Sequence, residues 1–406
     1  MEDYGIIGGG PAGYTLGMML ASKGKSVVLF EKDKLGGTCL NKGCIPTKSF
    51  LHSSDLYAEI KTNSCGISAD GLNVDFSKVR EKKTQTVEKI RKSLELAVKN
   101  SGVKTVYAEA CVKDKNTIVA GEDEYKFDKI ILATGAKPRE IKGLEFDGDF
   151  ILSSDDILEL NTLPKSLLII GSGAIGIEWA RIMSNFDAEV TIVEMAEHLI
   201  PAADIEVSKR IERIFKQKKI KYYLNDCIEK VENRQVTLKS GVILNPEKIL
   251  VAVGRVPVCP DCECERVLGD ACGEIQLAHY AIHQAKAEAL GIPFDKALVP
   301  SVIYGEPEIA WVGIREQDTD ESYKKVTLPI TALGKAWCDD ATDGFIKLIT
   351  KDNKIKGAHI VSKEASSLIH TVLIAMQNEI TTEQLEVSCF AHPTYSEGLF
   401  EALLRL

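Results

Sequence analysis

The first thirty residues or so alternate between apolar and glycine-rich stretches in the order strand, turn, helix, strand. Residues 4–10 are a short apolar run that ends in glycines, and residues 12–23 carry alanine and leucine at helical spacing. Residues 26–31 form a second apolar run of strand length. Two short runs joined through a glycine turn and a helix are typical of a β-α-β unit.

The same order of elements returns in the middle of the chain. An apolar strand at 166–170 leads into a glycine turn at 171–176, a helix that ends near residue 185 and a further strand at 189–194. Repetition of one supersecondary unit predicts two subdomains of the same kind, here of the dinucleotide-binding type.

Two other regions follow different patterns. Residues 75–100 form a charged stretch whose helical period places four apolar residues on one face, with the charged face expected in solvent; these residues are Val87, Ile90, Leu94 and Val98.

The C-terminal region, from about residue 300, mixes strands with one apolar helix. The strands are expected at 301–304, 345–350 and 357–361, and the helix at 365–377. This mixture predicts a third domain of the α+β class, so the whole chain is expected to be an α/β protein with two Rossmann-like domains and a smaller third one.

Composition narrows the function classes. The 406 residues carry 59 acidic and 50 basic side chains, a net charge of −9, which excludes a general nucleic-acid binder. No apolar run approaches the ~20 residues of a membrane span, and the acidic N-terminus is unlike a signal peptide, so we expect a cytoplasmic protein. Eleven cysteines, an odd number in a long chain, argue against a secreted disulfide framework.

The first glycine set is Gly8-x-Gly10-x-x-Gly13, directly after the first strand. One glycine makes a tight turn, one lets the backbone approach a pyrophosphate and one allows close helix packing, while the helix N-terminus offers N–H groups to the phosphates. Glu31 ends the next strand, where its carboxylate is placed to accept hydrogen bonds from ribose hydroxyls.

The second set is Gly171-x-Gly173-x-x-Gly176, with Glu194 at the end of its second strand. The acid follows the first glycine by the same interval in both units, from 8 to 31 and from 171 to 194. A carboxylate at Glu194 accepts from a free 2′-hydroxyl but repels a 2′-phosphate, and no Arg or Lys lies between residues 195 and 205. The second site is therefore expected to prefer NAD over NADP.

A pair of cysteines, Cys39 and Cys44, follows the first unit. Pro46 suits the first turn of a helix, so the pair is expected at a helix N-terminus, where the pKa of a thiol is lowered. A disulfide that closes so small a loop gains little stabilisation, which is typical of bonds that exchange. The glycines around the pair favour this interpretation over two unrelated buried thiols.

Two histidines are interpreted differently. His392 is followed by Pro393 and by Glu397, so a carboxylate is available to orient an imidazole whose ordinary pKa suits moving thiol protons near neutral pH. His370 lies within the apolar helix at 365–377, and we expect it to be a packed core residue.

A second group of cysteines comprises Cys259, Cys262, Cys264 and Cys272. Four cysteines in so short a stretch raise the alternative of a zinc or iron–sulfur site. No glycine or aromatic knuckle surrounds them, so we expect exposed or packed thiols and no metal.

Taken together, the two glycine fingerprints, the segment 36–48, the Ala133-Thr134-Gly135 run and the segment 392–397 resemble the pyridine-nucleotide-disulfide oxidoreductases. The resemblance covers nearly the whole chain and is strongest to members that oxidise dihydrolipoamide. It implies FAD in the first unit, NAD in the second and a C-terminal domain for dimerisation. The implied boundaries are 1–143 (completed by about 265–295), 144–258 and 296–406.

The resemblance also implies roles for single residues. Cys39 resembles the thiol that meets the substrate and Cys44 the thiol that faces the flavin. Lys48 resembles the lysine beside the flavin ring, paired with the glutamate that Glu178 matches. His392 resembles the acid/base, which in the family reaches the cysteine pair of the other subunit.

The remaining assignments rest on the resemblance alone. Glu397 resembles the carboxylate that orients the histidine, and the Asp270 carboxylate the group that holds the ribityl chain. The other positions assigned to the cofactors are Thr38, Ala110, Thr134, Gly135, Ala278 and Gly254. The implied partners are dihydrolipoamide, on the lipoyl domain of a 2-oxoacid dehydrogenase or glycine-cleavage complex, and a second copy of the chain.

One segment departs from the family pattern. Members carry several tens of residues between the strand that ends at Gly254 and the Gly269-Asp270 motif, whereas here residues 257–268 span the whole distance. Either the chain returns from the second unit to the flavin domain by a short connection, or a segment is missing from the sequence. The last strand of the flavin domain's sheet is therefore in question. Two alternatives stay open: a relative acting on another disulfide such as glutathione, and a non-catalytic metal-binding subunit.

Overall fold

Strand β1 (Glu2–Ile7) lies at the centre of the first sheet because its last residues are apolar and buried on both faces. In the computed structural model, which describes residues 1–62 and 66–406, this sheet has the order β3-β2-β1-β6-β5-β4, with β17 added on β6. The other strands are β2 (Val27–Glu31), β3 (Lys104–Tyr107), β4 (Ala110–Asp114), β5 (Thr117–Ala120), β6 (Asp123–Leu132) and β17 (Arg266–Val267).

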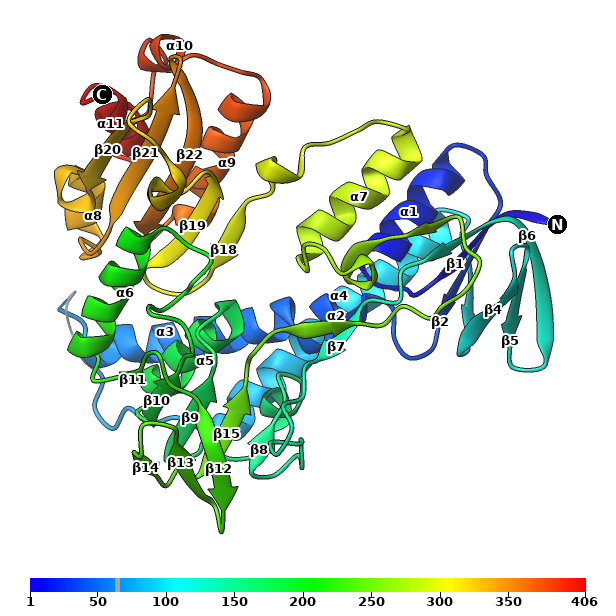
Figure 1. Ribbon diagram of the computed structural model, residues 1–406, viewed down its shortest axis with the longest axis horizontal. Helices are drawn as coiled ribbons and strands as arrows, with labels where there is room; N and C mark the ends of the chain where they lie inside the picture. Colours follow the sequence, from blue (N-terminus) through cyan, green and yellow to red (C-terminus); the bar gives the residue numbers. More distant parts are fainter. Residues whose placement is uncertain (63–65) are drawn as a thin grey trace.

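Helices cover one face of this sheet and the β4–β5 hairpin lies against the other (Figure 1). Helix α1 (Pro11–Ser22) packs beside α7 (Ala278–Leu290) through small side chains such as Ala12 and Ala281. The predicted helix at 12–23 and strand at 26–31 are therefore confirmed within a residue or two.

The second unit repeats this arrangement. Its parallel sheet has the order β11-β10-β9-β15-β8, and α5 (Ala174–Asn185) follows the glycine turn. The strands are β8 (Ile151–Leu152), β9 (Ser166–Ile170), β10 (Glu189–Val193), β11 (Lys221–Tyr223) and β15 (Lys248–Val251), and α6 is Ile205–Gln217. Helices α5 and α6 pack on one face of this sheet. A small antiparallel sheet covers its opposite face and is formed by β12 (Ile228–Glu232), β13 (Gln235–Leu238) and β14 (Ile243–Leu244).

The C-terminal lobe is an antiparallel sheet of order β18-β19-β22-β21-β20 with helices packed on it, as the α+β pattern predicts. Its strands are β18 (Ser301–Ile303), β19 (Glu308–Gly313), β20 (Lys324–Pro329), β21 (Phe345–Lys351) and β22 (Lys354–Ser362). Its helices are α8 (Gly334–Cys338), α9 (Ala365–Gln377), α10 (Thr382–Glu386) and α11 (Glu397–Leu403).

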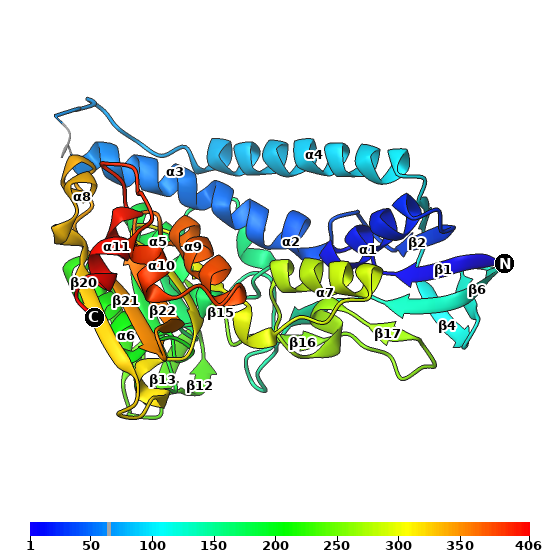
Figure 2. The same cartoon turned by 90° about the horizontal axis from the view of Figure 1, so that it is seen from above.

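Two long helices connect the lobes. Helix α3 (Cys44–Thr62) runs from the short helix α2 (Gly37–Lys42) to the second lobe, and α4 (Phe76–Asn100) lies alongside it (Figure 2). On α3, Phe50 packs against Trp179 of α5 with ring centroids 5.5 Å apart. This contact fixes the start of α3 against the second dinucleotide unit.

Two sequence interpretations are wrong in detail. On α4, Val87 and Val98 are buried but Ile90 is 41% exposed, and in its turn the inward position is taken by Arg91, which is 17% exposed. Lys83 is also buried on this face and pairs with Glu159 at 2.8 Å. His370 is exposed on α9 and is not a core residue, because the buried stripe of that helix passes through its neighbours on the inner face.

The short connection at 257–268 completes the first sheet directly. After β16 (Arg255–Pro257), which pairs with β7 (Ala136–Pro138), the chain reaches β17, which lies parallel to β6. Backbone bonds from Glu265 to Ile130 and from Leu268 to Leu132, both 2.8 Å, continue the ladder. The chain therefore crosses by a short route, and the sheet has its last strand.

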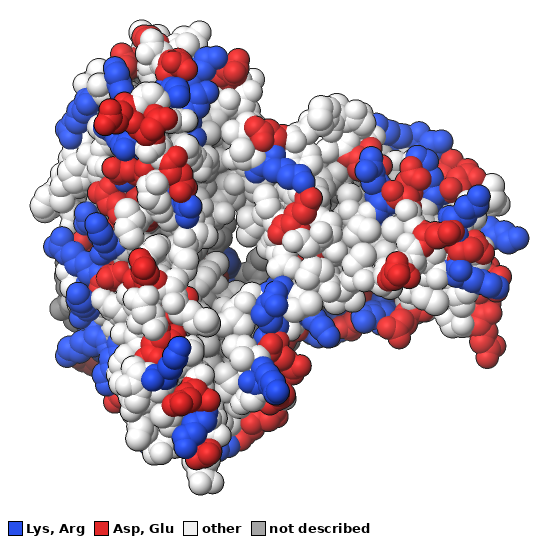
Figure 3. All heavy atoms as spheres, viewed as in Figure 1, with Lys and Arg blue, Asp and Glu red and all other residues white. Residues whose placement is uncertain are grey.

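Charged side chains of both signs are spread over the surface. Figure 3 shows acidic and basic side chains interspersed over one face of the molecule, which is notched between the first lobe and the other two. Within the described ranges, no helix is both long and apolar enough to cross a membrane.

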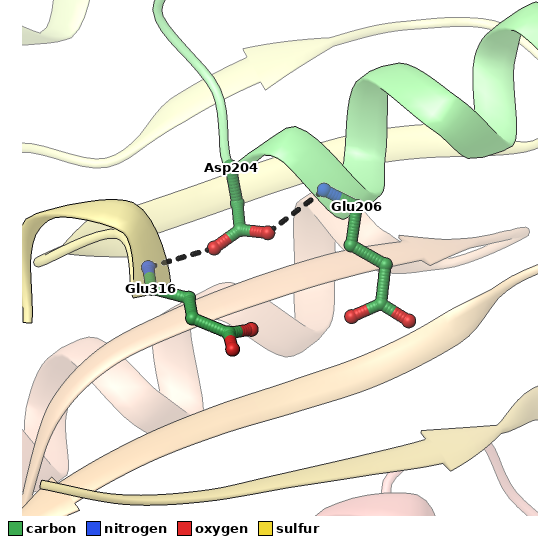
Figure 4. Close-up of side chains that lie close together, drawn as sticks. All are labelled: Asp204, Glu206 and Glu316. Carbon is green, nitrogen blue, oxygen red and sulfur yellow. Dashed lines mark hydrogen bonds between the residues drawn. The ribbon is translucent and has the colours of Figure 1, made fainter. Parts of the chain in front are cut away.

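A buried ion cluster joins the second lobe to the third. Lys347 of β21, only 1% exposed, places its ammonium 2.8 Å from Asp204, 3.2 Å from Glu206 and in contact with Glu316. Asp204 also accepts from the backbone N–H of Glu206, in the first turn of α6, and from that of Glu316, in a turn that follows β19 (Figure 4). The three carboxylates lie as close together as the ligands of a cation would, and the Lys347 ammonium is that cation.

We expect the variant Lys347→Met to lose about 3 kcal/mol of stability, because three carboxylates, one of them fully buried, keep their charge without a partner. The measurement is the thermal unfolding midpoint of the purified protein. The control is Lys325→Met, because Lys325 contacts Glu316 at 3.7 Å but is 32% exposed, and its loss is expected to cost under about 1 kcal/mol. Equal midpoints for the two variants would contradict this assignment.

Candidate active site

The two glycine loops have the same geometry. Gly8 and Gly171 have φ of +108° and +98°, and a Cβ on either would lie within 2.6 Å of a carbonyl of the neighbouring strand end. A Cβ on Gly13 or Gly176 would lie about 2 Å from the carbonyl oxygen of the first glycine, 1.9 Å and 2.1 Å respectively. The first and third glycines therefore serve the turn and the helix packing, as predicted.

The middle glycines face open space. A Cβ on Gly10 would meet nothing nearer than 3.8 Å, and a Cβ on Gly173 would meet no protein atom within 4 Å. Both lie at the start of a helix, before α1 and α5, where backbone N–H groups are not used within the helix. The space beside each helix N-terminus fits a pyrophosphate that approaches the backbone closely.

The acids that close the two units bond to their loops in the same way. Glu31 accepts from the N–H of Gly9 and of Asp33, both at 2.8 Å. Glu194 accepts from the N–H of Ser172 at 2.8 Å and from that of Ala196 at 2.9 Å. Oε2 of Glu194 also accepts from the Ser172 hydroxyl at 2.7 Å, which leaves Oε1 of Glu194 and both oxygens of Glu31 with a further lone pair for a ribose hydroxyl.

The Cys39 and Cys44 thiols lie side by side, one at the third position of α2 and the other at the first position of α3. The Cys39 thiol donates to the Cys44 sulfur, and this bond, with the charge of Lys48, lowers the pKa of Cys44 to about 7 against the opposing effect of burial. The same bond and burial raise the pKa of Cys39. In the reduced pair Cys44 is therefore the thiolate and Cys39 the thiol.

Lys48 lies one turn into α3 and is held by residues of the other two lobes. Its ammonium bonds both oxygens of Glu178 on α5, at 2.8 and 2.9 Å. It also lies 4.5 Å from the centre of the Tyr304 ring, just after β18, and the Tyr304 N–H donates to Glu178 at 3.1 Å. Sequence patterns did not point to Tyr304, because an aromatic residue at a strand end carries no distinguishing signal.

The His392 imidazole lies in the third lobe and bonds Glu397 through Nδ1 at 2.7 Å. The second oxygen of Glu397 accepts from the N–H of Thr394 at 2.8 Å, and this bond together with the imidazole lowers the pKa of Glu397. An ionised carboxylate only accepts, so Nδ1 carries the proton and Nε2 is left as the base. The imidazole is 77% exposed, and none of its described contacts is with the cysteine pair.

The other predicted cofactor residues are only partly brought together. Thr134 and Gly135 follow β6 and bond the backbone of Val258, the Gly135 carbonyl accepting from its N–H at 2.8 Å. Asp270 lies in a single turn beside α7, burial raises the pKa of its carboxyl, and none of the described hydrogen bonds reaches that carboxyl. A half-buried acid near the first glycine loop fits a hydroxyl-bearing ligand.

Four assignments are left as predictions. Thr38 is half-buried in α2 and Ala278 begins α7, close to the first unit. Gly254 follows β15, and Ala110 begins β4, directly after Glu109, which pairs with Lys32 beside Glu31 at 3.7 Å. None of the described contacts decides whether these four residues touch a cofactor.

Comparisons with known proteins agree with this geometry. Residues 2–281 match the family model described as pyridine nucleotide-disulphide oxidoreductase, and residues 299–403 match its dimerisation domain. The dihydrolipoyl dehydrogenase of Bacillus subtilis is 33% identical over 98% of this chain and 97% of its own length. That of Chlamydia pneumoniae is also 33% identical, over 99% of this chain and 96% of its own.

Solved structures have the same fold. LpdA from Mycobacterium tuberculosis has a TM-score of 0.91 at 23% identity, with 99% of both chains covered. The flavoprotein disulfide reductase RclA from Escherichia coli has a TM-score of 0.87 at 24% identity, again with 99% of both chains covered. On the two matched family models and the full-length relatives, the chain belongs to the pyridine nucleotide-disulphide oxidoreductase family.

Proposed function

We propose that this protein is an FAD-dependent dihydrolipoamide dehydrogenase that oxidises dihydrolipoamide to lipoamide and reduces NAD+. The observation that carries the proposal is the Cys39–Cys44 pair at the start of α3, with a lysine–glutamate pair one turn behind it. The full-length relatives named dihydrolipoyl dehydrogenase support the choice of substrate.

Each residue of the site has a separate role in the proposed reaction. A substrate thiol gives its proton to Nε2 of His392, and the resulting thiolate attacks the Cys39 sulfur of the oxidised pair. The Cys39–Cys44 bond breaks and Cys44 leaves as a thiolate, which Lys48 stabilises. The second substrate thiol then displaces Cys39, which takes a proton, and lipoamide is released with its new disulfide.

The cofactors fit the two glycine loops. FAD would be held by the loop of Gly8, Gly10 and Gly13 with Glu31 and Asp270, and NAD by the second loop with Glu194. The bound flavin supplies two-electron chemistry between the Cys44 thiolate and NAD+. Lys48 would hold a positive charge beside the ring, and Glu178 would fix the position of that lysine.

We propose a homodimer, since the C-terminal lobe matches a dimerisation domain and His392 has no described contact with the cysteine pair of its own chain. His392 of one subunit would then serve the cysteines of the other. The domain boundaries 1–143 with 265–295, 144–258 and 296–406 belong to this proposal. So do the lipoyl domain of a multienzyme complex as partner and the cytoplasm as location.

The direct test is NADH formation by the FAD-loaded protein with free dihydrolipoamide. Turnover is expected for the wild type and none above background for Cys44→Ser, which cannot form the disulfide. Parallel assays with the disulfides of glutathione and coenzyme A and either nicotinamide cofactor separate other members of the family. A colourless protein that contains zinc and no flavin would contradict the proposal.

The Tyr304 ring offers a test of how the thiolate is stabilised. In Tyr304→Leu the Lys48 ammonium loses the aromatic face that holds it, so the pKa of Cys44 is expected to rise from about 7 toward the ordinary value of a thiol. Tyr304→Phe keeps the ring and is expected to leave this pKa unchanged. The measurement is the pH dependence of Cys44 alkylation in the reduced protein, and a rise in both variants would exclude the ring as the cause.

The choice of nicotinamide cofactor tests Glu194. We expect the wild type to prefer NAD+, and Glu194→Gln to reduce the ratio of kcat/KM for NAD+ to that for NADP+ by about fivefold or more. The reason is that one like charge about 4 Å from the 2′-phosphate costs at least ~1 kcal/mol. Glu189→Gln, an exposed acid at the start of β10, is the control and should leave the ratio unchanged.

A further inference from the structure

The loop that joins β10 to α6, residues 194–204, begins with the acid of the second dinucleotide unit and is tied to the glycine loop of that unit. The tie is Ser172, which lies between the first two glycines and is fully buried. Its hydroxyl donates to Glu194 at 2.7 Å and accepts from the Ile200 N–H at 3.2 Å. One hydroxyl therefore holds both the carboxylate and the middle of the loop.

The far side of the same loop is bonded by the C-terminal lobe. Two side chains in the turn after β19 make three bonds to it. Arg315 donates through Nη1 to the Pro201 carbonyl at 3.3 Å. Gln317 donates to the Ala203 carbonyl at 3.2 Å and accepts from the Ile205 N–H at 3.3 Å. These bonds cover the stretch of the loop that directly follows its contact with the glycine loop.

The turn that makes these bonds is itself fixed. Nε and Nη2 of Arg315 donate to the two oxygens of Asp318 at 2.6 and 3.1 Å. The Glu316 N–H, between the two bonding side chains, donates to Asp204 at 2.8 Å (Figure 4), and the buried Lys347 ammonium holds the same carboxylate. The turn is thus a rigid support and not a chance contact between two loops.

The corresponding loop of the first unit is held without help from another lobe. Residues 32–36 follow Glu31, and all their described bonds stay within the first lobe. Among these are the bond from the Gly36 N–H to the Gly9 carbonyl at 2.8 Å and that from Asn41 to the Leu35 carbonyl at 3.0 Å. Within the described ranges, the second unit alone has the loop after its acid bonded by a different lobe.

We propose that Arg315 and Gln317 are positioning residues for the nicotinamide dinucleotide. They hold the loop and, through Ile200 and Ser172, keep Glu194 where it accepts from the ribose. Without them the loop has more freedom, and NAD+ must order it on binding, which weakens the affinity. This inference rests on the proposed function, in which NAD+ binds the second glycine loop. The lobe that supplies the acid/base would then also set the affinity for NAD+.

In the experiment, the FAD-loaded wild type and the double variant Arg315→Ala/Gln317→Ala are titrated with NAD+ in a calorimeter. The dissociation constant is expected to rise about fivefold in the double variant, which is the order of one lost hydrogen bond. The kcat at saturating NAD+ and the KM for dihydrolipoamide are expected to stay at the wild-type values, because both side chains bond the loop and not the cysteines or the imidazole.

The matched control is Arg234→Ala/Gln235→Ala, which removes the same two residue types from the second lobe. Their described side-chain bonds go to Asp149 and Asn245, and none of them reaches residues 194–204. This variant is expected to bind NAD+ as tightly as the wild type, so that a loss in the first variant is specific to the turn of the C-terminal lobe.

The variant Ser172→Ala separates positioning from a general loss of stability. It lacks the hydroxyl that joins the loop to Glu194, so adding the substitutions of Arg315 and Gln317 is expected to change the dissociation constant by less than about twofold. A purely structural role of the two side chains would instead lower the thermal midpoint and weaken NAD+ binding equally with and without Ser172.

An unchanged dissociation constant in the double variant would overturn the inference, as would the same fold-change in both backgrounds. The titrations contain no dihydrolipoamide. A wild type that binds NAD+ but does not oxidise dihydrolipoamide therefore contradicts the proposed function, whereas the comparison of dissociation constants still decides the role of the turn.

Discussion

The contact between Lys48 and Glu178 is the interaction on which the active site depends. It joins helices from two lobes, and a residue of the third lobe contacts both side chains. Lys48 comes from the helix that begins at Cys44, Glu178 from the first helix of the second dinucleotide unit, and Tyr304 from the end of the first strand of the C-terminal lobe. The charge of Lys48 lowers the pKa of Cys44, and the contacts of Lys48 with Glu178 and Tyr304 hold that charge beside the thiol. Packing of Phe50 on Trp179 supplies the apolar support for this arrangement.

The redox cysteines and the proposed acid/base lie in different lobes, as the pairs Cys39–Cys44 and His392–Glu397. The cysteines are half-buried beside the first glycine loop, whereas the imidazole is exposed in the C-terminal lobe and oriented from its own side by Glu397. Each half has the protonation state that its task needs: a sulfur ionised near neutral pH, and an imidazole whose outer nitrogen is free to take a proton. Assembly of two chains is what would bring the halves together.

The two dinucleotide loops and the position of the cysteine pair could be predicted from the sequence, because each depends on a local pattern of residues. Glycine spacing with a following acid placed both dinucleotide loops, and Pro46 placed the cysteines at a helix start. The contacts that could not be predicted depend on long-range packing. Ile90 has the helical period of a core residue but faces solvent, since the buried stripe of α4 passes through Arg91 in that turn, and Arg91 is 17% exposed. Tyr304 and Lys347 act through partners more than a hundred residues away, and no local pattern reports such a partner.

The matching bonds of Glu31 and Glu194 have a consequence for how each dinucleotide site responds to substitution. Each acid ties the end of one strand to the loop after the neighbouring strand, at 2.8 Å in both units. The loop that would face a pyrophosphate and the carboxylate that would face a ribose are therefore one connected element. A change at either acid would act on both ends of its nucleotide at once, whereas the other unit, which has its own acid and its own loop, would keep its shape.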